Sequence, residues 1–286
     1  MKVLPEDFSQ YFNTRRFREI YNTTVANYKA VMSEEDFITY AEDFRLNSGA
    51  FELKYQNSLE PLIERYCFID DIKKHMITVA YTREGEIIGI QFDLYETFDS
   101  DTVYTKNEYV FPVNDEWFIL WGGSNKFFNY HYPYSTQRYA YDLIQTISGH
   151  QHNGLQNNLE SYFSYGKDVV APLEGEVVKV YLHQSDNEIM TMNMEHPEGN
   201  AVVLKHANDE YSMVAHLQAG SIEVAEGDFV KQGTLLGRSG NSGASSSPHL
   251  HFQVMNGLDP LEAQSIRIRF KDYEVEPIQS ETIKGV

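Results

Sequence analysis

The sequence lacks most of the features that would crosslink a chain or hold it in a membrane. It contains one cysteine, Cys67, so no disulfide can form within the chain. A single thiol also excludes a zinc site built from several cysteines, which leaves histidine and carboxylate side chains as candidate metal ligands. Because no run of about 18 consecutive apolar residues occurs, we expect no membrane-spanning helix.

Positive charge is also scarce. The chain has 23 Lys and Arg residues against 42 Asp and Glu residues, which gives a formal net charge of −19. A chain this acidic repels phosphate backbones, so we expect no nucleic-acid partner. The first residues, Met1–Asp7, contain no apolar stretch of the kind found in signal peptides. Two explanations stay open: the protein remains inside the cell, or a leader was removed from this chain.

The composition is that of a folded protein with much β-structure. Hydrophobic residues make up 42% of the 286 positions, and there are 20 tyrosines and 17 phenylalanines. Aromatic side chains pack well on pleated sheets, so this content favours strands. The length suits one large or two ordinary domains.

Residues 1–122 are predicted to form an α+β domain. Apolar residues between Phe8 and Tyr21 have helical spacing, and Ser33 is a suitable N-cap for a second helix that ends before Gly49. Two hairpins are expected next, one from strands 76–81 and 87–92 and one from strands 104–111 and 117–121. This order resembles the cone-shaped folds similar to nuclear transport factor 2.

Residues 123–286 are predicted to form a second, all-β domain, which begins at the Gly-rich run 122–125. Helical spacing nearly vanishes there, and short apolar runs alternate with turn residues. The expected strands are residues 168–172, 175–181, 200–205, 211–216, around 229, 235–236 and 249–255.

The most informative motif of this second domain is His249-Leu250-His251, which follows a Gly/Ser-rich run over residues 240–248. Side chains alternate along a strand, so the two imidazoles are expected to share one face. One imidazole can then bind a metal while the other faces a substrate or a water molecule. A lone histidine, His216, lies upstream.

Taken in order, several segments resemble the motifs of the LytM/lysostaphin-like zinc endopeptidases, peptidase family M23. The matching segments are Gln137–Asp142, Val169–Val177, Gly199–His206, Ala215–Leu217, Gly227–Gly237 and Gly240–Phe252. The resemblance implies an antiparallel sheet domain that binds one Zn²⁺ and hydrolyses peptide bonds of bacterial peptidoglycan in the cell envelope or outside the cell. It also implies that Asp142 and His251 bind the metal and that His216 and His249 are catalytic.

The chain departs from this family at one position. The first metal ligand of the family is a histidine four residues before the aspartate, where this chain has Arg138. On a strand, residues four apart share a face, so Arg138 would point at the metal, which a guanidinium cannot bind.

Three explanations are open for this departure. A histidine from elsewhere supplies the missing bond, for which His131 is the candidate and His150 or His152 are alternatives. Or the strand shifts and Arg138 turns outward. Or no zinc binds and Arg138 pairs with Asp142; the domain would then be an inactive module that binds peptidoglycan or regulates a partner hydrolase. A carrier domain of the biotinyl or lipoyl type is a weaker option, because the modifiable lysine is missing.

Overall fold

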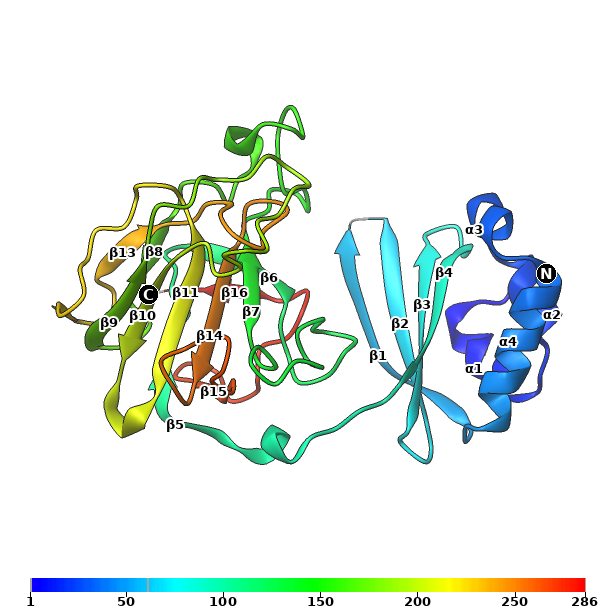
Figure 1. The fold of residues 1–286 in the computed structure, drawn as a ribbon. Helices are drawn as coiled ribbons and strands as arrows, with labels where there is room; N and C mark the ends of the chain where they lie inside the picture. The colour runs from blue at the N-terminus through cyan, green and yellow to red at the C-terminus, as the bar shows by residue number, and fades with distance from the viewer. Residues whose placement is uncertain (1, 61, 286) are drawn as a thin grey trace. The chain divides into compact units, whose positions relative to one another are not determined.

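The structure, a computed structural model, describes residues 2–60 and 62–285 and divides the chain into two compact units (Figure 1). The first unit ends at Thr97 and the second begins at Phe98. The predicted division between residues 122 and 123 differs from this one. The difference arises because β6 (Glu116–Trp121) pairs with β7 (Tyr141–Ile144) inside the main sheet of the second unit.

The first unit places four helices against one face of a four-stranded antiparallel sheet (Figure 1). Its elements are α1 (Pro5–Asn13), α2 (Phe17–Asn22), α3 (Ala26–Val31), α4 (Glu34–Leu46), β1 (Phe51–Glu60), β2 (Ile63–Asp70), β3 (His75–Thr82) and β4 (Ile87–Leu94). The Ser33 cap is confirmed, since its hydroxyl accepts a hydrogen bond from Asp36 N at 3.1 Å. The predicted β3–β4 hairpin is confirmed too. The predicted first helix is split where Arg15 adopts a φ of +60°. The likeness to nuclear transport factor 2 stays a prediction.

The regular structure of the second unit, in its described residues, consists of β-strands and three short 3-10 helices. Its strands are β5 (Tyr104–Tyr109), β6, β7, β8 (Asp168–Val170), β9 (Gly175–Tyr181), β10 (Asn200–Lys205), β11 (Tyr211–Leu217), β12 (Phe229–Val230), β13 (Leu235–Arg238), β14 (Leu250–Met255), β15 (Arg267–Phe270) and β16 (Thr282–Lys284). Eight of them form one antiparallel sheet in the order β12-β9-β10-β11-β14-β7-β6-β16, while β13-β8 and β15-β5 form two small sheets. The predicted antiparallel architecture is therefore present, with the parallel β15–β5 pair as an exception.

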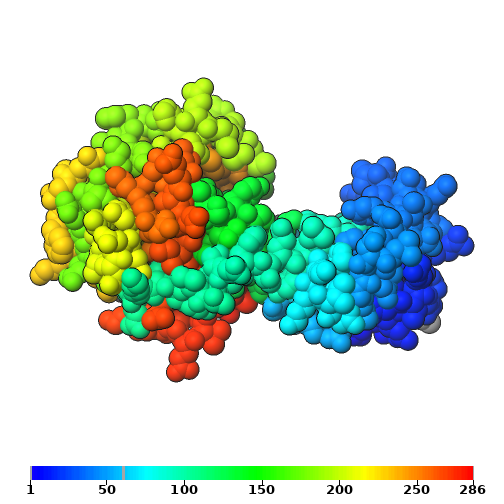
Figure 2. Space-filling model, turned by 60° about the horizontal axis from the view of Figure 1, so that its bottom comes forward, coloured from blue at the N-terminus to red at the C-terminus, as the bar shows by residue number. Residues whose placement is uncertain are grey.

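One predicted pairing is wrong. Residues 104–111 and 117–121 were expected to form a hairpin, but β5 pairs with β15 and β6 pairs with β7 and β16. Alternating apolar residues show which face of a strand is buried and do not show which strand lies beside it. In Figure 2 the C-terminal residues (red) lie against residues near 105 (teal) on the surface of the second unit, as this pairing requires.

The main sheet has one apolar face and one face that carries polar groups. On β14, the side chains of Leu250, Phe252 and Val254 join the large core of the second unit. His251 and Gln253 alternate with them and point to the opposite side, as the period of two requires. This opposite side of β14 and its neighbours is where the candidate site lies.

A buried carboxylate organises the first unit. Asp70, at the end of β2, is 1% exposed. It accepts backbone hydrogen bonds from Gly49 (3.0 Å), Lys74 (2.8 Å) and His75 (3.0 Å), and its Oδ2 lies 2.9 Å from His75 Nδ1. Burial raises the pKa of Asp70, but these hydrogen bonds to its ionised form outweigh burial and hold the pKa below its usual value.

We expect Asp70→Asn to lower the free energy of unfolding of the first unit by about 2 kcal/mol, because an amide cannot accept all of these bonds. The lowered pKa of the folded state means that Asp70 stabilises the unit at neutral pH. This stabilisation is lost as the pH falls below about 4 and through the folded-state pKa. Urea unfolding followed by far-UV circular dichroism measures both effects, since α1–α4 all lie in this unit. Asp43→Asn, an exposed change on α4, is the control and should leave stability unchanged.

Candidate metal-binding site

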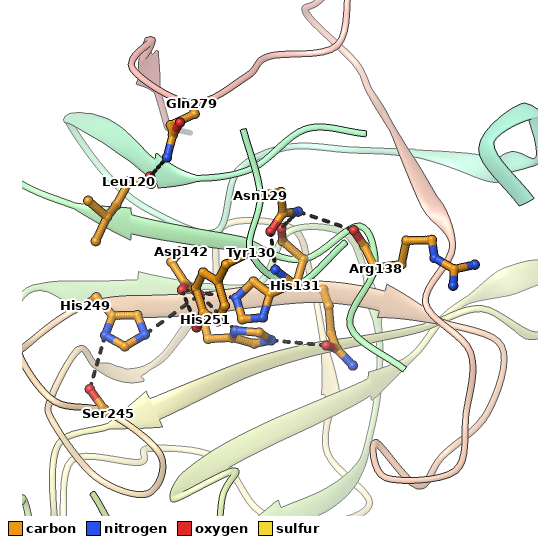
Figure 3. Close-up of polar contacts among 12 residues, drawn as sticks. Leu120, Asn129, Tyr130, His131, Arg138, Asp142, Ser245, His249, His251 and Gln279 are labelled. Carbon is orange, nitrogen blue, oxygen red and sulfur yellow. Dashed lines mark hydrogen bonds and ion pairs between the residues drawn. The ribbon is translucent and has the colours of Figure 1, made fainter. Parts of the chain in front are cut away.

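Asp142 lies at the centre of the site. It is on β7, directly opposite His251 of β14, and it is 2% exposed. Its Oδ1 is 2.9 Å from His251 Nδ1, and its Oδ2 is 3.1 Å from both His131 Nε2 and the Tyr130 hydroxyl (Figure 3). Backbone pairing of two neighbouring strands thus fixes one carboxylate and one imidazole, and a loop adds a second imidazole.

His131 reaches Asp142 from an irregular loop, residues 129–140, that precedes β7. Asn129, which is fully buried, holds this loop. Its amide nitrogen donates to the carbonyls of Gly123 (3.1 Å) and Ala140 (3.0 Å), and its amide oxygen accepts from His131 N at 3.0 Å. One ligand atom each from His131, Asp142 and His251 lie within 4.8 Å of one another, and all three residues are buried. This set is the kind that a divalent metal binds.

The hydrogen bonds of His251 indicate where a cation fits. The oxygen of the Gln253 amide lies 3.1 Å from His251 Nε2, while the amide nitrogen of Gln253 is directed to the sulfur of Met255. An amide oxygen accepts, so His251 Nε2 carries a proton. His251 Nδ1 nevertheless lies close to a carboxylate oxygen, which requires either a second proton or a cation between the two atoms. A metal ion that binds Nδ1 would displace that proton.

His131 has a ring nitrogen to spare. Its Nδ1 is buried and has no hydrogen-bond partner among the described residues. Burial lowers the pKa of His131 and outweighs the nearby Asp142 carboxylate, which raises it. In the metal-free protein Nε2 donates to Asp142 Oδ2 at 3.1 Å; with the proton moved to Nδ1, the neutral ring would offer its Nε2 lone pair to a metal ion at this place. The donor set therefore fits a metal ion that is bound by one carboxylate and two imidazoles.

Two further histidines lie beside this group. The His249 ring precedes His251 on the same face, with Nε2 3.8 Å from Asp142 Oδ1. The His216 ring is centred 4.8 Å from the His249 ring and 5.6 Å from the His251 ring. His249 Nδ1 lies 2.9 Å from the Ser247 carbonyl, and His216 Nδ1 lies 2.9 Å from the Ser242 carbonyl. Both rings therefore carry a proton on Nδ1, which leaves Nε2 able to accept one.

A β-bulge brings His216 to the site. Val214 and Leu217 of β11 both lie in the large core, whereas Ala215 lies on the opposite face. Strict alternation would put residue 216 on the core face. The register with β10 shifts by one residue at this point, and His216 adopts a φ of +63°, which non-glycine residues rarely do. The extra residue turns both Ala215 and His216 to the site face.

Burial and neighbouring charges shift the pKa values of three groups of the site, Asp142, His216 and Tyr130. Burial raises the pKa of Asp142, but the charges and hydrogen bonds of His131, His249 and His251 outweigh it and hold that pKa well below its usual value. Burial and two neighbouring imidazoles lower the pKa of His216 well below its usual value, so this ring is neutral. Burial and the Asp142 carboxylate raise the pKa of Tyr130, so this hydroxyl keeps its proton.

Arg138 does not occupy the metal position. Residue 138 lies in a turn, and β7 begins only at Tyr141, so the expectation that Arg138 shares a strand face with Asp142 is wrong. The guanidinium points away from the site (Figure 3) and lies 3.4 Å from the centre of the Phe98 ring. Arg138 and Asp142 form no ion pair within the described ranges, so the structure gives no support to the predicted pairing of these two residues.

The structure thus brings together every residue predicted for the site: Asp142, His131, His251, His216 and His249. His150 and His152, the alternative ligands, do not belong to the group of three. Sequence reasoning missed Tyr130 and Gln253. A signal existed for Gln253, since residues 249, 251 and 253 alternate along one strand face, whereas nothing in the sequence pointed to Tyr130.

Part of the second unit is similar in sequence to known peptidases. The sequence profile of Peptidase family M23 matches residues 151–263, which include His216, His249 and His251 but not Asp142. The peptidoglycan DD-endopeptidase ShyA of Vibrio cholerae is 32% identical over 104 residues, which are 36% of this chain and 23% of that protein. The DD-carboxypeptidase/endopeptidase Mpg of Neisseria meningitidis serogroup B is 34% identical over 103 residues, which are 36% of this chain and 22% of that protein. The chain therefore spans less than a quarter of the length of these relatives.

The solved structures that match the chain include the catalytic domain of lysostaphin from Staphylococcus simulans. That domain is 24% identical, with a TM-score of 0.31, and the match covers 44% of this chain and 73% of that one. On the sequence matches and the motifs, the second unit of this chain contains a peptidase family M23 domain of the LytM/lysostaphin type.

Proposed function

We propose that the second unit is a zinc metalloendopeptidase that hydrolyses peptide bonds of peptidoglycan. The observation that carries this proposal is the position of His131. Its Nε2 lies 3.1 Å from Asp142 Oδ2, so His131, Asp142 and His251 form a set of three candidate ligands. The set is complete even though this chain has Arg138 where the family motif has a histidine. Three protein ligands and an open position for water are what a hydrolytic zinc site needs.

The substrate class comes from the relatives. ShyA is named as a peptidoglycan DD-endopeptidase and Mpg as a DD-carboxypeptidase/endopeptidase. A chain that acts on peptidoglycan works outside the cytoplasm, so we place this protein in the cell envelope or outside the cell. In the described part of the chain, no helix has the length and apolar character to cross a membrane.

A cavity of about 270 Å³ opens onto the candidate ligands His131 and His251 and onto His216. Its walls include Met192 and Met194, which are 56% and 67% exposed. Methionine side chains are flexible and adapt to irregular partners. This lining suits a peptide that places small or apolar groups beside the metal.

The chemistry follows from the hydrogen bonds of the histidines. His131, Asp142 and His251 would hold a zinc ion, which would supply the Lewis acid for hydrolysis. Water adds to the carbonyl carbon, and its proton passes to Nε2 of His249 or His216, which accepts it because Nδ1 donates to a backbone carbonyl. As the C–N bond breaks, the leaving amine takes a proton from an imidazolium formed in this way. The Tyr130 hydroxyl donates to Asp142 Oδ2 and thereby helps to hold this carboxylate in place.

The rival function is a metal-free module that binds peptidoglycan or regulates a partner hydrolase. Its support was the expectation from the sequence that the Arg138 guanidinium lies at the metal position. Since Arg138 points away from the site, no observation favours this function over hydrolysis, and it becomes an outcome of the experiment on metal content.

We expect the purified protein to bind about one zinc ion per chain and His131→Ala to lose it under the same conditions. The reason is that a site left with two ligands binds the ion far more weakly. Metal analysis after dialysis against a known concentration of free zinc measures both proteins. His150→Ala is the matched control and should keep the metal, because His150 is exposed and outside the group of three. A wild-type protein without zinc would support the binding module instead.

We expect Gln253→Leu to weaken zinc binding by about 10- to 100-fold, because the leucine side chain cannot accept the hydrogen bond from His251 Nε2. Gln253→Glu should retain tight binding, since a carboxylate oxygen accepts the same bond. Competition with a chelator of known affinity measures the dissociation constants. Equal affinities for the leucine and glutamate variants would show that the Nε2 partner is unimportant.

We expect His216→Ala and His249→Ala each to reduce the rate of peptidoglycan hydrolysis by about 10²- to 10⁴-fold while the zinc content stays the same. Release of soluble fragments from purified peptidoglycan measures the rate, and metal analysis measures the zinc. If either variant retained the wild-type rate, that residue would have no role in proton transfer.

A further inference from the structure

The loop that carries His131 is bound at both ends by one carboxylate outside the site. Asp101 accepts a hydrogen bond from the Tyr132 hydroxyl at Oδ2 and another from the Tyr139 hydroxyl at Oδ1, each at 2.7 Å. Both tyrosines are buried, with exposed fractions of 1% and 2%. Tyr132 directly follows His131, and Tyr139 lies at the end of the loop, just before β7. A single side chain therefore ties the start and the end of this loop together.

Arg138 also connects the loop of residues 129–140 to segment 98–101. Its Nε donates to the Tyr132 carbonyl and its Nη1 donates to Ser100 Oγ, both at 3.0 Å. The guanidinium also lies over the Phe98 ring, at 3.4 Å from its centre, and the Phe98 ring is 5.2 Å from the Tyr132 ring. The arginine that replaces the histidine of the family motif thus contacts both the backbone next to His131 and the segment 98–101.

Segment 98–101 is itself well fixed. Phe98 N donates to Asp101 Oδ2 at 2.8 Å, and Arg267 Nη1 donates to the Asp101 carbonyl at 2.7 Å. The Arg267 guanidinium is held in turn by two hydrogen bonds to the Glu276 carboxylate, at 3.0 and 2.6 Å. The fixed Arg267 guanidinium thus holds the backbone of residue 101, and the Phe98 amide holds its carboxylate, so the Asp101 side chain has little freedom to move.

The loop needs such support because it has no strand partner. Between residues 131 and 140 it consists of turns, and its local backbone bonds are short-range, such as Tyr134 N to His131 O and Ala140 N to Gln137 O. Side chains on irregular loops are placed less accurately than those on strands, and metal ligands tolerate little displacement. Asp142 and His251 have paired strands beneath them, whereas the loop of His131 is held by Asn129, by the contacts to segment 98–101 and by Ser265, which binds Ser135 O and Tyr139 N.

We propose that Asp101 and Arg138 are positioning residues, and that they hold the loop of residues 129–140 so that His131 reaches Asp142 and the metal. This proposal rests on the proposed function, since it treats His131 as a ligand. It also assigns a role to the substitution of the family's first ligand. The ligand is then His131, on the loop, and Arg138, which stands where the family motif has a histidine, helps to fix that loop.

The test compares Asp101→Asn with Asp99→Asn. The asparagine at 101 cannot accept hydrogen bonds from both tyrosines, and we expect its zinc dissociation constant to rise by about 10- to 100-fold, the range typical of outer partners of a metal ligand. Asp99 lies in the same short helix, is exposed, and makes no side-chain hydrogen bond within residues 2–60 and 62–285. Its variant removes the same charge and should bind zinc like the wild type. A second pair is Arg138→Met and its control Arg269→Met, which changes an exposed arginine. We expect the first to raise the zinc dissociation constant by the same factor and the second to leave it unchanged.

Two measurements that depend on His131 distinguish a positioning role of Asp101 from a general effect on stability. In a His131→Ala background, Asp101→Asn should change the remaining zinc affinity by less than about twofold, because its effect passes through the missing ring. In the metal-free protein, Asp101→Asn should shift the ¹⁵N signals of the His131 imidazole, and Asp99→Asn should not. Urea unfolding of each variant shows that the measurements are made on folded protein.

The outcomes of this experiment are distinguishable. Equal zinc affinity and unchanged His131 signals in the two aspartate variants would overturn the positioning role while zinc binding by the wild type still supported the proposed function. A wild-type protein that binds no zinc would overturn the proposed function. The ¹⁵N signals would then still decide whether Asp101 places His131 beside Asp142.

Discussion

The buried carboxylate of Asp142 is the constraint on which the site depends. A buried charge without partners destabilises a fold by several kcal/mol, so its surroundings must supply hydrogen-bond donors or a cation. Here His131, His251 and Tyr130 supply them from a strand and a loop. The same demand that organises these side chains in the metal-free protein also produces a cluster of ligands that a divalent ion can use.

Under the proposed function, the loop that precedes Asp142 would supply the metal ligand that Arg138 cannot supply. His131 enters from that loop, and Arg138 turns to a second task among Phe98, Ser100 and Tyr132. A guanidinium suits this task because it can bind a carbonyl, a hydroxyl and an aromatic face at once. A chain with arginine at residue 138 can therefore still bring one carboxylate and two imidazoles together.

His216 and His249, the two histidines proposed to be catalytic, are placed by different means. His249 is placed by the alternation of β14, but His216 needs the bulge in β11 and an unfavourable backbone conformation. Strained conformations persist only where the surrounding structure enforces them, and they gather at functional sites. The Ser242 carbonyl, which accepts from His216, belongs to the Gly/Ser-rich run before β14, so this run both delivers His249 and orients His216.

The sequence alone determined much of the second unit. Turn residues and apolar alternation predicted β9 and β10 residue for residue, and the period of two placed His249 and His251 on one face, because these are local properties of a strand. Tertiary structure decided what depends on chain paths: where the first unit ends, that β5 pairs with β15, and that Arg138 points away while His131 reaches Asp142. The direction of residue 138 could not be predicted, because strand periodicity does not apply in a turn, and a turn's side chains are placed by contacts with residues distant in sequence.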